Sequence, residues 1–380
     1  MPWKDVSLMS QRLEFVALAA AEGANVRELC RRFAISPKTA YKWIARHRDG
    51  GDDALADRPR RPASSPARCP GDLEAAVLRL RDDHPAWGGR KLRARLAAMG
   101  MAAVPAASTI TAILRRHGRL DPAASAAATP WVRFEHDAPN RLWQMDFKGH
   151  FAAGAGRCHP LTILDDHSRY AVGLYACGDQ REATVRRLLE ATFRAHGLPE
   201  RILCDNGSPW GPCGGEARHT GLTVWLLRLG VGVSHGRPFH PQTQGKDERF
   251  HRTLKAEVIQ GRAFRDLEAC RSGFEAWRET YNHRRPHEAL GLAVPASRYR
   301  MSERPYPEAP PSWEYGPGDA VRKVACDGTI SFRGRRAVLG KAFRGERVAV
   351  RPADADGSFG VYFGVHRVAG IDLRAHNDLH

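Results

Sequence analysis

Two acidic residues in the middle of the chain have the setting expected of metal-binding carboxylates. Asp146 lies in Trp143-Gln144-Met145-Asp146-Phe147, where apolar and polar residues alternate, so a strand would carry it on its polar face. Asp205 follows a short apolar run and precedes Asn206-Gly207, which predicts an acid at the carboxyl end of a buried strand. Open α/β sheets bind ligands at that edge. Because Mg²⁺ takes hard oxygen ligands, carboxylates gathered there would suit phosphoryl transfer.

A third acid, Glu248, lies where an extended loop leads into a predicted helix. From Lys246 onward apolar residues recur at intervals of four, at Phe250, Leu254 and Val258, which predicts a face that packs on a sheet. Glu248, Arg252 and Lys255 fall at i, i+4 and i+7, so the carboxylate shares a face with two cations able to hold phosphates. An ordinary surface Glu–Arg pair would give the same local pattern, and Asp247 is a competing acid.

Four sequence blocks resemble, in their order, the Asp, Asp, Glu core of bacterial insertion-sequence transposases in the retroviral-integrase superfamily. They are Trp143-Gln144-Met145-Asp146, Asp205-Asn206-Gly207, His240-Pro241-Gln242-Thr243-Gln244-Gly245-Lys246-Asp247-Glu248-Arg249 and Tyr281-Asn282-His283-Arg284-Arg285-Pro286-His287-Glu288-Ala289-Leu290-Gly291. The resemblance covers roughly residues 130–300 and implies a ribonuclease-H-like α/β core with Asp146, Asp205 and Glu248 as catalytic and metal-binding residues. The family pattern, with Glu between Lys-x and Arg, favours Glu248 over Asp247.

One departure from the family concerns spacing. The interval from Asp205 to Glu248 is 43 positions (248 − 205), longer than in retroviral-type members. The excess is assigned to a Gly-rich surface insertion at residues 210–219, which would cost little closure entropy.

The resemblance implies a DNA transposase that binds the terminal inverted repeats of its own element, cuts there and joins the 3′ ends to target DNA. The three carboxylates would hold two Mg²⁺ ions, about 3.5 to 4 Å apart in such sites, and Mn²⁺ also suits an all-oxygen site. Water would be the nucleophile in cleavage and the 3′-hydroxyl in strand transfer. Since one site serves one DNA end, we expect a homo-multimer assembled on double-stranded DNA.

Two alternatives remain open at this point. A catalytically silent DNA-binding regulator derived from a transposase would keep the DNA-binding modules, although the three acids argue against lost catalysis. A ribonuclease-H-like metal nuclease would have little use for sequence-reading modules. Two further acids, Asp165 and Asp166, precede the polar turn His167-Ser168-Arg169 and are interpreted as structural turn residues.

Composition limits the function classes. The chain has 380 residues and a net charge of +17, which favours a polyanionic partner such as nucleic acid. Eight scattered cysteines form no CxxC pair, so neither a zinc site nor a disulfide framework is indicated. No signal peptide or membrane-length apolar run is apparent, so we expect a cytoplasmic, nucleoid-associated protein with no membrane partner.

Two helical modules precede the core. Three short helices between residues 10 and 48, with Asn25 and Ser36 as caps, follow the helix-turn-helix plan. A second module contains Trp87-Gly88-Gly89-Arg90-Lys91-Leu92, which is similar to a turn in the second DNA-binding module of these transposases. The residues expected to bind DNA in the modules and on the catalytic helix are Lys38, Thr39, Tyr41, Lys42, Arg46, Arg90, Lys91, Lys246, Arg249, Arg252 and Lys255.

The predicted organisation is therefore multidomain. It comprises an all-α helix-turn-helix domain (1–56), a basic Pro-rich linker (57–70), a second helix-turn-helix-like domain (71–119), an Ala/Pro linker (120–131), an integrase-type catalytic core (132–300), a Pro-rich linker (301–313) and a small β-barrel (314–373). In the core, three successive strands followed by alternating helices and strands predict a mixed sheet with helices on both faces.

Overall fold

The computed structural model describes residues 8–57, 69–120, 135–211, 219–236, 245–309 and 311–374. The chain divides into two compact units, Met1–Arg68 and Cys69–His380. Most of the two predicted linkers before the core, the middle of the Gly-rich insertion (212–218) and the loop from His240 to Gln244 lie outside the described residues. No described helix is long and apolar enough to cross a bilayer.

The first unit contains the predicted helix-turn-helix arrangement. Its helices are α1 (Leu8–Ala19), α2 (Val26–Arg32) and α3 (Pro37–Gly50), followed by a 3₁₀ turn (Asp52–Leu55). The Asn25 side chain accepts hydrogen bonds from two backbone N–H groups of α2, and Ser36 accepts one from Thr39 N–H in α3. Phe15, Trp43 and Leu55 are buried between the helices, so the module has its own core.

The second unit begins with three helices, α4 (Gly71–Asp83), α5 (Gly89–Ala98) and α6 (Ala107–Arg116). They bury Trp87, Leu92 and Ile110 in a separate small core. Gly89 is required where α5 meets α6, because a Cβ there would lie 2.5 Å from the carbonyl oxygen of Ala107. The predicted second helical module is present.

The core contains a six-stranded mixed sheet in the order β2-β3-β1-β5-β6, with β4 paired to β3. Its strands are β1 (Trp143–Phe147), β2 (Phe151–Ala153), β3 (Gly156–Asp165), β4 (Ala171–Cys177), β5 (Arg201–Cys204) and β6 (Gly232–His235). β1 is antiparallel to β3 and parallel to β5, so the predicted mixed sheet is confirmed. The short hairpin strand β2 was not predicted.

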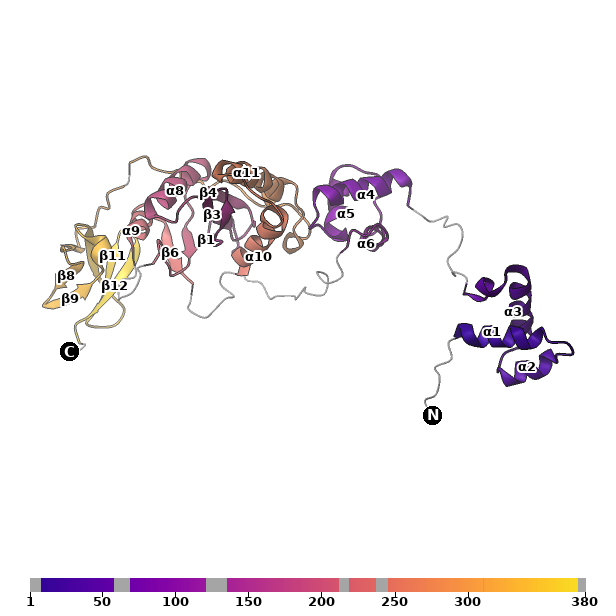
Figure 1. Ribbon diagram of the computed structural model, residues 1–380. Coiled ribbons are helices and arrows are strands. Elements are labelled where there is room, and N and C mark those ends of the chain that lie inside the picture. Colours follow the sequence, from indigo (N-terminus) through magenta and orange to yellow (C-terminus); the bar gives the residue numbers. More distant parts are fainter. Residues whose placement is uncertain are drawn as a thin grey trace. The chain divides into compact units, whose positions relative to one another are not determined.

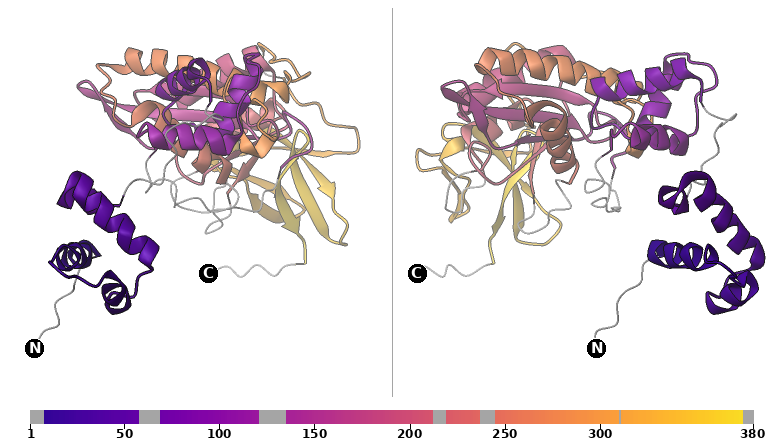
Figure 2. Two further views of the ribbon diagram at one scale, coloured as in Figure 1. Left: turned by 90° about the vertical axis from the view of Figure 1, so that its right-hand side faces the viewer. Right: turned by 45° about the vertical axis from the view of Figure 1, so that its right-hand side comes forward.

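Helices cover both faces of this sheet, as predicted (Figure 1; Figure 2). On one face, α8 (Glu182–His196) and α9 (Gly221–Arg228) pack against Trp143 and Met145 of β1. On the other face lie α10 (Gly245–Leu254), a π-helical turn (Lys255–Ile259) and α11 (Leu267–His283). The strict alternation in β1 therefore directs its apolar residues toward α8 and its polar residues toward α10.

The catalytic-helix candidate α10 is packed as its apolar spacing predicts. Phe250, Leu254 and Val258 are at most 2% exposed. The ring of Tyr281 from α11 meets Phe250 edge-on at 4.9 Å. The neighbouring Asn282 exchanges two hydrogen bonds with the backbone of Ala171 at the β4 edge. The block from Tyr281 onward thus contributes packing and edge-covering groups around α10.

Two details correct the sequence-based expectations. Trp210, assigned to the surface insertion, is 1% exposed and stacks near Phe147 at 5.9 Å, so that part of the insertion belongs to the core. The C-terminal strands form a four-stranded sheet in the order β12-β11-β10-β7 and a separate β8-β9 pair, and the described strands do not close into a barrel. These strands are β7 (Ala320–Lys323), β8 (Thr329–Phe332), β9 (Arg335–Val338), β10 (Arg347–Pro352), β11 (Ser358–Phe363) and β12 (His366–Asp372).

Candidate active site

Asp146 lies on β1 and faces α10. Its side chain is 24% exposed, and its register partner in β3 is Thr162. The Thr162 hydroxyl donates to the Asp146 carbonyl oxygen at 3.0 Å. The carboxylate Oδ2 lies 3.9 Å from His251 Nδ1 on α10. Strand pairing and helix packing thus hold Asp146 while leaving its carboxylate partly open to solvent.

Asp205 comes directly after β5, the strand that pairs with β1. Its Oδ1 accepts a hydrogen bond from Gly207 N–H at 3.2 Å, and its carbonyl oxygen accepts one from His235 Nδ1 at 2.8 Å. Because β1 and β5 are parallel neighbours, their carboxyl ends lie at one sheet edge. The two predicted aspartates are therefore brought to the same edge.

The two carboxylates influence each other's ionisation. Burial, then repulsion from Asp205, raises the pKa of Asp146 to about 6. Burial is also the main cause of the raised pKa of Asp205, opposed by the Gly207 hydrogen bond and by His235. Among the described residues, neither carboxylate is paired with a lysine or arginine.

This donor set fits a divalent cation. Two hard oxygen donors held together with raised pKa values constitute an excess of negative charge that a cation would neutralise. Within the described ranges, however, no three His, Cys, Asp or Glu side chains lie close enough together to hold a metal ion. A third ligand from α10 therefore stays a prediction.

The two neighbouring acids of α10 lie in different environments. Asp247 is 2% exposed, and its Oδ1 has no hydrogen-bond partner among the described residues. Burial, then repulsion from Asp146 and Asp166, raises its pKa well above the usual range. Glu248 is exposed at the helix surface. Glu248 is thus the acid of this pair that is open to a ligand from solvent.

Two groups beside Asp146 were missed by the sequence analysis. His251 accompanies Glu248 at i+3, and its Nε2 lies 2.8 Å from the Thr162 hydroxyl oxygen. Since that hydroxyl donates to Asp146, its oxygen accepts the His251 Nε2 proton, which leaves Nδ1 unprotonated toward Asp146. Burial and then Lys148 lower the pKa of His251 to about 4, so the ring is neutral at pH 7.

Lys148 is the second missed group. It follows Asp146 by two positions on β1's polar side, and burial and then Lys255 lower its pKa. Lys148, which follows β1, and Lys255, the first residue of the π-helical turn after α10, therefore lie near each other. The polar alternation that singled out Asp146 also includes Lys148 and could have identified it.

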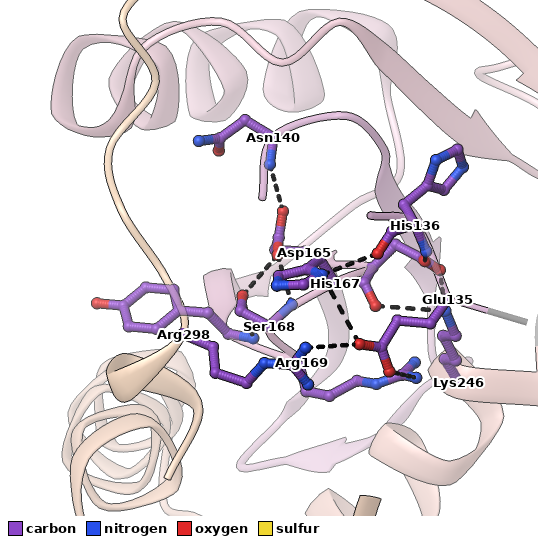
Figure 3. A network of polar contacts seen from close by, with 11 residues as sticks. Glu135, His136, Asn140, Asp165, His167, Ser168, Arg169, Lys246 and Arg298 are labelled. Carbon is purple, nitrogen blue, oxygen red and sulfur yellow. Dashed lines mark hydrogen bonds and ion pairs between the residues drawn. The ribbon is translucent and has the colours of Figure 1, made fainter. Parts of the chain in front are cut away.

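Asp165 and Asp166 are the structural groups that the sequence indicated, and they are buried, at 0% and 1% exposed. Asp165 accepts hydrogen bonds from Asn140 N–H at 2.7 Å and from the N–H and hydroxyl of Ser168 at 2.8 and 2.5 Å. Figure 3 shows these contacts within a larger polar network that includes Glu135 and Lys246. The network joins residues 135–140, the β3–β4 turn and the first turn of α10.

The cations predicted to bind DNA on α10 and on the π-helical turn that follows it differ in accessibility. Lys246 forms an ion pair with Asp166, and its side chain is 16% exposed. Arg249 is exposed and lies 3.9 Å from Glu288. Arg252 and Lys255 are exposed on the side of Glu248. Arg249, Arg252 and Lys255 are thus exposed, whereas Lys246 is not.

In the helical modules, several predicted DNA contacts are exposed. On α3, Lys38, Tyr41 and Lys42 are exposed, and Tyr41 reaches 60%. The Lys42 ammonium lies 4.2 Å and the Arg46 guanidinium 5.0 Å from the Trp43 ring centroid. Thr39 is bonded to the cap residue Ser36 at 2.9 Å between hydroxyl oxygens.

On α5, Arg90 is exposed, but Lys91 is partly buried. Burial, then Arg285, lowers the pKa of Lys91 to about 8. The two residues predicted to contact DNA from α5 therefore differ in accessibility.

The chain matches several protein families. Residues 136–241 and 229–295 match two integrase core domain families, and residues 319–379 match the IS481 family transposase C-terminal domain. Residues 11–63 match a helix-turn-helix domain, and residues 39–114 match a homeodomain-like domain. The matches cover both helical modules, the core and the C-terminal sheets.

Relatives include proteins of bacterial insertion elements. An uncharacterized protein of insertion element IS407 from Burkholderia multivorans is 27% identical over 47% of this chain and 61% of its own length. A protein of insertion element IS476 from Xanthomonas euvesicatoria is 29% identical over 42% of this chain and 44% of its own. A putative transposase of IS5376 from Geobacillus stearothermophilus is 22% identical over 54% and 51%. The chain thus spans 44% to 61% of the length of these relatives.

Among solved structures, the HTLV-2 integrase catalytic core domain in complex with magnesium matches with a TM-score of 0.33 and 14% identity, over 43% of this chain and 99% of that one. The family matches place helix-turn-helix domains, an integrase core and a transposase-type C-terminal domain in one chain. The chain therefore contains regions similar to helix-turn-helix domains, an integrase core and an IS481 family transposase C-terminal domain, and its relatives include insertion-element proteins.

Proposed function

We propose that the protein is a DNA transposase that binds the terminal inverted repeats of its insertion sequence, cleaves at the element ends and joins the 3′ ends to target DNA. The observation that carries this proposal is the Asp146–Asp205 pair. Two acids from adjacent strands, with raised pKa values and no cationic partner among the described residues, are suited to divalent-metal phosphoryl transfer.

Asp146, Asp205 and Glu248 are the proposed metal ligands and catalytic residues. Bound Mg²⁺ or Mn²⁺, two ions per site, would supply activation of the attacking oxygen and stabilisation of the leaving oxygen. Asp146 and Asp205 would provide two of the oxygen donors, and Glu248, which is exposed on α10, would provide the third. Neutral His251 adds no positive charge that would compete with a cation at Asp146.

The cations beside the acids would hold DNA. Lys148 and Lys255 lie near each other next to Asp146, and Arg252 is exposed on the side of Glu248. They are suited to phosphates on either side of the scissile bond. Lys38, Tyr41, Lys42 and Arg46 of the first module and Arg90 of the second are proposed contacts to the inverted repeat, together with Thr39, Lys91 and Arg249. Lys246, also predicted from the sequence to contact DNA, is paired with Asp166. Paired ends would require a homo-multimer on DNA.

Strand joining in vitro tests the proposal. A labelled duplex carrying the inverted repeat is incubated with Mg²⁺ and native protein, Glu248→Gln or Asp247→Asn. We expect native protein and Asp247→Asn to join the duplex to target DNA, and Glu248→Gln to bind it without joining. Binding without joining by all three proteins would contradict the proposal and favour a DNA-binding regulator. Loss of joining in Asp247→Asn alone would identify Asp247 as the third carboxylate.

A further inference from the structure

Asp166 touches two of the three elements that carry the proposed active-site acids, β1 and α10. Its Oδ1 accepts a hydrogen bond from the Gln144 side chain at 2.7 Å and also pairs with Lys246. Its Oδ2 accepts a hydrogen bond from His136 N–H at 2.9 Å, and its carbonyl oxygen lies 3.3 Å from Lys246 Nζ. Gln144 precedes Asp146 by two positions on the same face of β1, and Lys246 precedes Glu248 by two positions on α10. One buried carboxylate therefore connects β1 to the first turn of α10.

Because of the helical spacing, the contact between Lys246 and Asp166 restricts the rotation of α10 about its axis. Successive residues of an α-helix are separated by about 100° around the axis. Lys246 and Glu248 are therefore about 200° apart, on opposite margins of the buried stripe of α10 that contains Phe250 and Leu254. If the Lys246 margin is held against the β3–β4 turn, Glu248 is held on the side of the helix next to His251, whose Nδ1 lies 3.9 Å from Asp146 Oδ2. A small rotation of α10 would displace Glu248 from that position.

Asp247, which is buried between these two margins, disfavours this orientation of α10 about its axis. Asp247 is 2% exposed and its Oδ1 has no hydrogen-bond partner among the described residues. Burying an unsatisfied polar group is unfavourable, so Asp247 by itself favours a rotation that brings it to solvent. The ion pair between Lys246 and Asp166, with side chains 16% and 1% exposed, acts against that rotation.

We propose that Asp166 and Lys246 are positioning residues, whose ion pair sets the rotation of α10 and thereby holds Glu248 toward Asp146. Lys246 accordingly contributes to strand joining through the helix and not through a phosphate contact. The activity readout of this inference rests on the proposed function. Figure 3 shows Lys246 beside the polar network that includes Asp165 and Glu135.

The first test separates positioning from DNA contact. Lys246→Met and Asp166→Asn are compared with native protein for joining rate at saturating duplex and for binding across a salt series. Each substitution should slow joining by roughly 30- to 100-fold, as expected for a misplaced reacting group. The slope of log affinity against log salt should stay unchanged. A slope reduced by about one in Lys246→Met, with the joining rate at saturation preserved, would show a phosphate contact and overturn the proposal.

The second test uses coupling and rescue. Because both residues act through one ion pair, the double variant should join no more slowly than the slower single variant. Asp247→Val keeps a similar side-chain volume and removes the buried carboxyl. Adding it to Lys246→Met should restore joining at least about tenfold, since the opposing force is gone. A shared role in helix rotation would be contradicted if the losses of the two single variants multiplied in the double variant, or if Asp247→Val did not restore joining in Lys246→Met.

A readout without activity keeps the two proposals distinguishable. Amide hydrogen exchange of α10 should accelerate in Lys246→Met and return toward the native rate when Asp247→Val is added. This result would support the positioning role even if native protein failed to join DNA, an outcome that would overturn the proposed function alone. Unchanged exchange in Lys246→Met would overturn the positioning role whatever the joining assay gives. Arg252→Met serves as the matched cation control, because Arg252 is exposed on the same helix; it should lower the salt slope without changing α10 exchange.

Discussion

The core contains two pairs of aspartates in different hydrogen-bonding environments. Asp165 and Asp166 are fully buried and accept hydrogen bonds from backbone, hydroxyl, amide and ammonium donors. Asp146 and Asp205 are partly exposed, and Asp205 accepts one backbone bond at its carboxylate. In a single fold, the saturated pair holds elements together, whereas the unsaturated pair retains negative charge for a ligand. The two pairs thus differ both in burial and in the number of donors around their carboxylates.

The largest effect expected from this difference concerns joining. Asp146→Asn and Asp205→Asn should each reduce strand joining by roughly 1,000-fold or more, because a cation loses a charged oxygen ligand. Both variants should remain folded by circular dichroism. Glu268→Gln, at an acid whose side chain is 67% exposed on α11, is the matched control and should join within about twofold of native protein. Joining at native rate in either Asn variant would remove that aspartate from the site.

Substitution in the structural pair, Asp165 and Asp166, should instead lower the stability of the fold. Asp165→Ala leaves three donors of Asn140 and Ser168 without their acceptor. The free energy of unfolding should fall by about 3 kcal/mol, measured by urea denaturation. Ser168→Ala, which removes only one of those donors, should cost about 1 kcal/mol. Equal stability of Asp165→Ala and native protein would end the distinction between the pairs.

The pH dependence of stability should sharpen the comparison. Because the Asp146 pKa is raised to about 6 in the folded protein, the folded state holds more protons than the unfolded state from about pH 4 to 6. Stability without metal should fall as pH rises through this window, and less so in Asp146→Asn. Conversely, Mg²⁺ should raise the melting temperature more at pH 7.5 than at pH 5, since it binds the ionised carboxylates. An equal Mg²⁺ effect at both pH values would place the ion elsewhere.

The smallest expected effect concerns the support of Asp146. Thr162→Val removes the hydroxyl that bonds both Asp146 O and His251, and should slow joining by roughly three- to tenfold. Thr192→Val is a close control, because Thr192 is also buried and its hydroxyl contacts Tyr175 and the Leu188 carbonyl on the opposite face. Both variants should lose about 1 kcal/mol of stability by thermal denaturation. Similar joining by both would assign Thr162 a purely structural role.

Much of the local structure could be predicted from residue patterns. The caps Asn25 and Ser36, the alternation around Asp146 and the stripe at Phe250 each depend on neighbours within a few positions, and each was confirmed. The short strand β2 and the burial of Trp210 were missed, because they depend on contacts with Cys158 and Phe147 formed only after folding. Barrel closure of the C-terminal strands was expected, but short strands alone do not specify which edges pair.

By itself, the sequence determined which residue types could do the chemistry and the local elements that carry them. Alternation gave Asp146 a polar strand face, and the four-residue stripe gave α10 its buried side. Only the tertiary structure decided that Asp146 and Asp205 repel each other, that Asp247 is buried while Glu248 is exposed, and that Lys246 is held by Asp166. Periodicity specifies one face of an element, whereas the charge environment of a side chain depends on groups from distant segments that folding brings together.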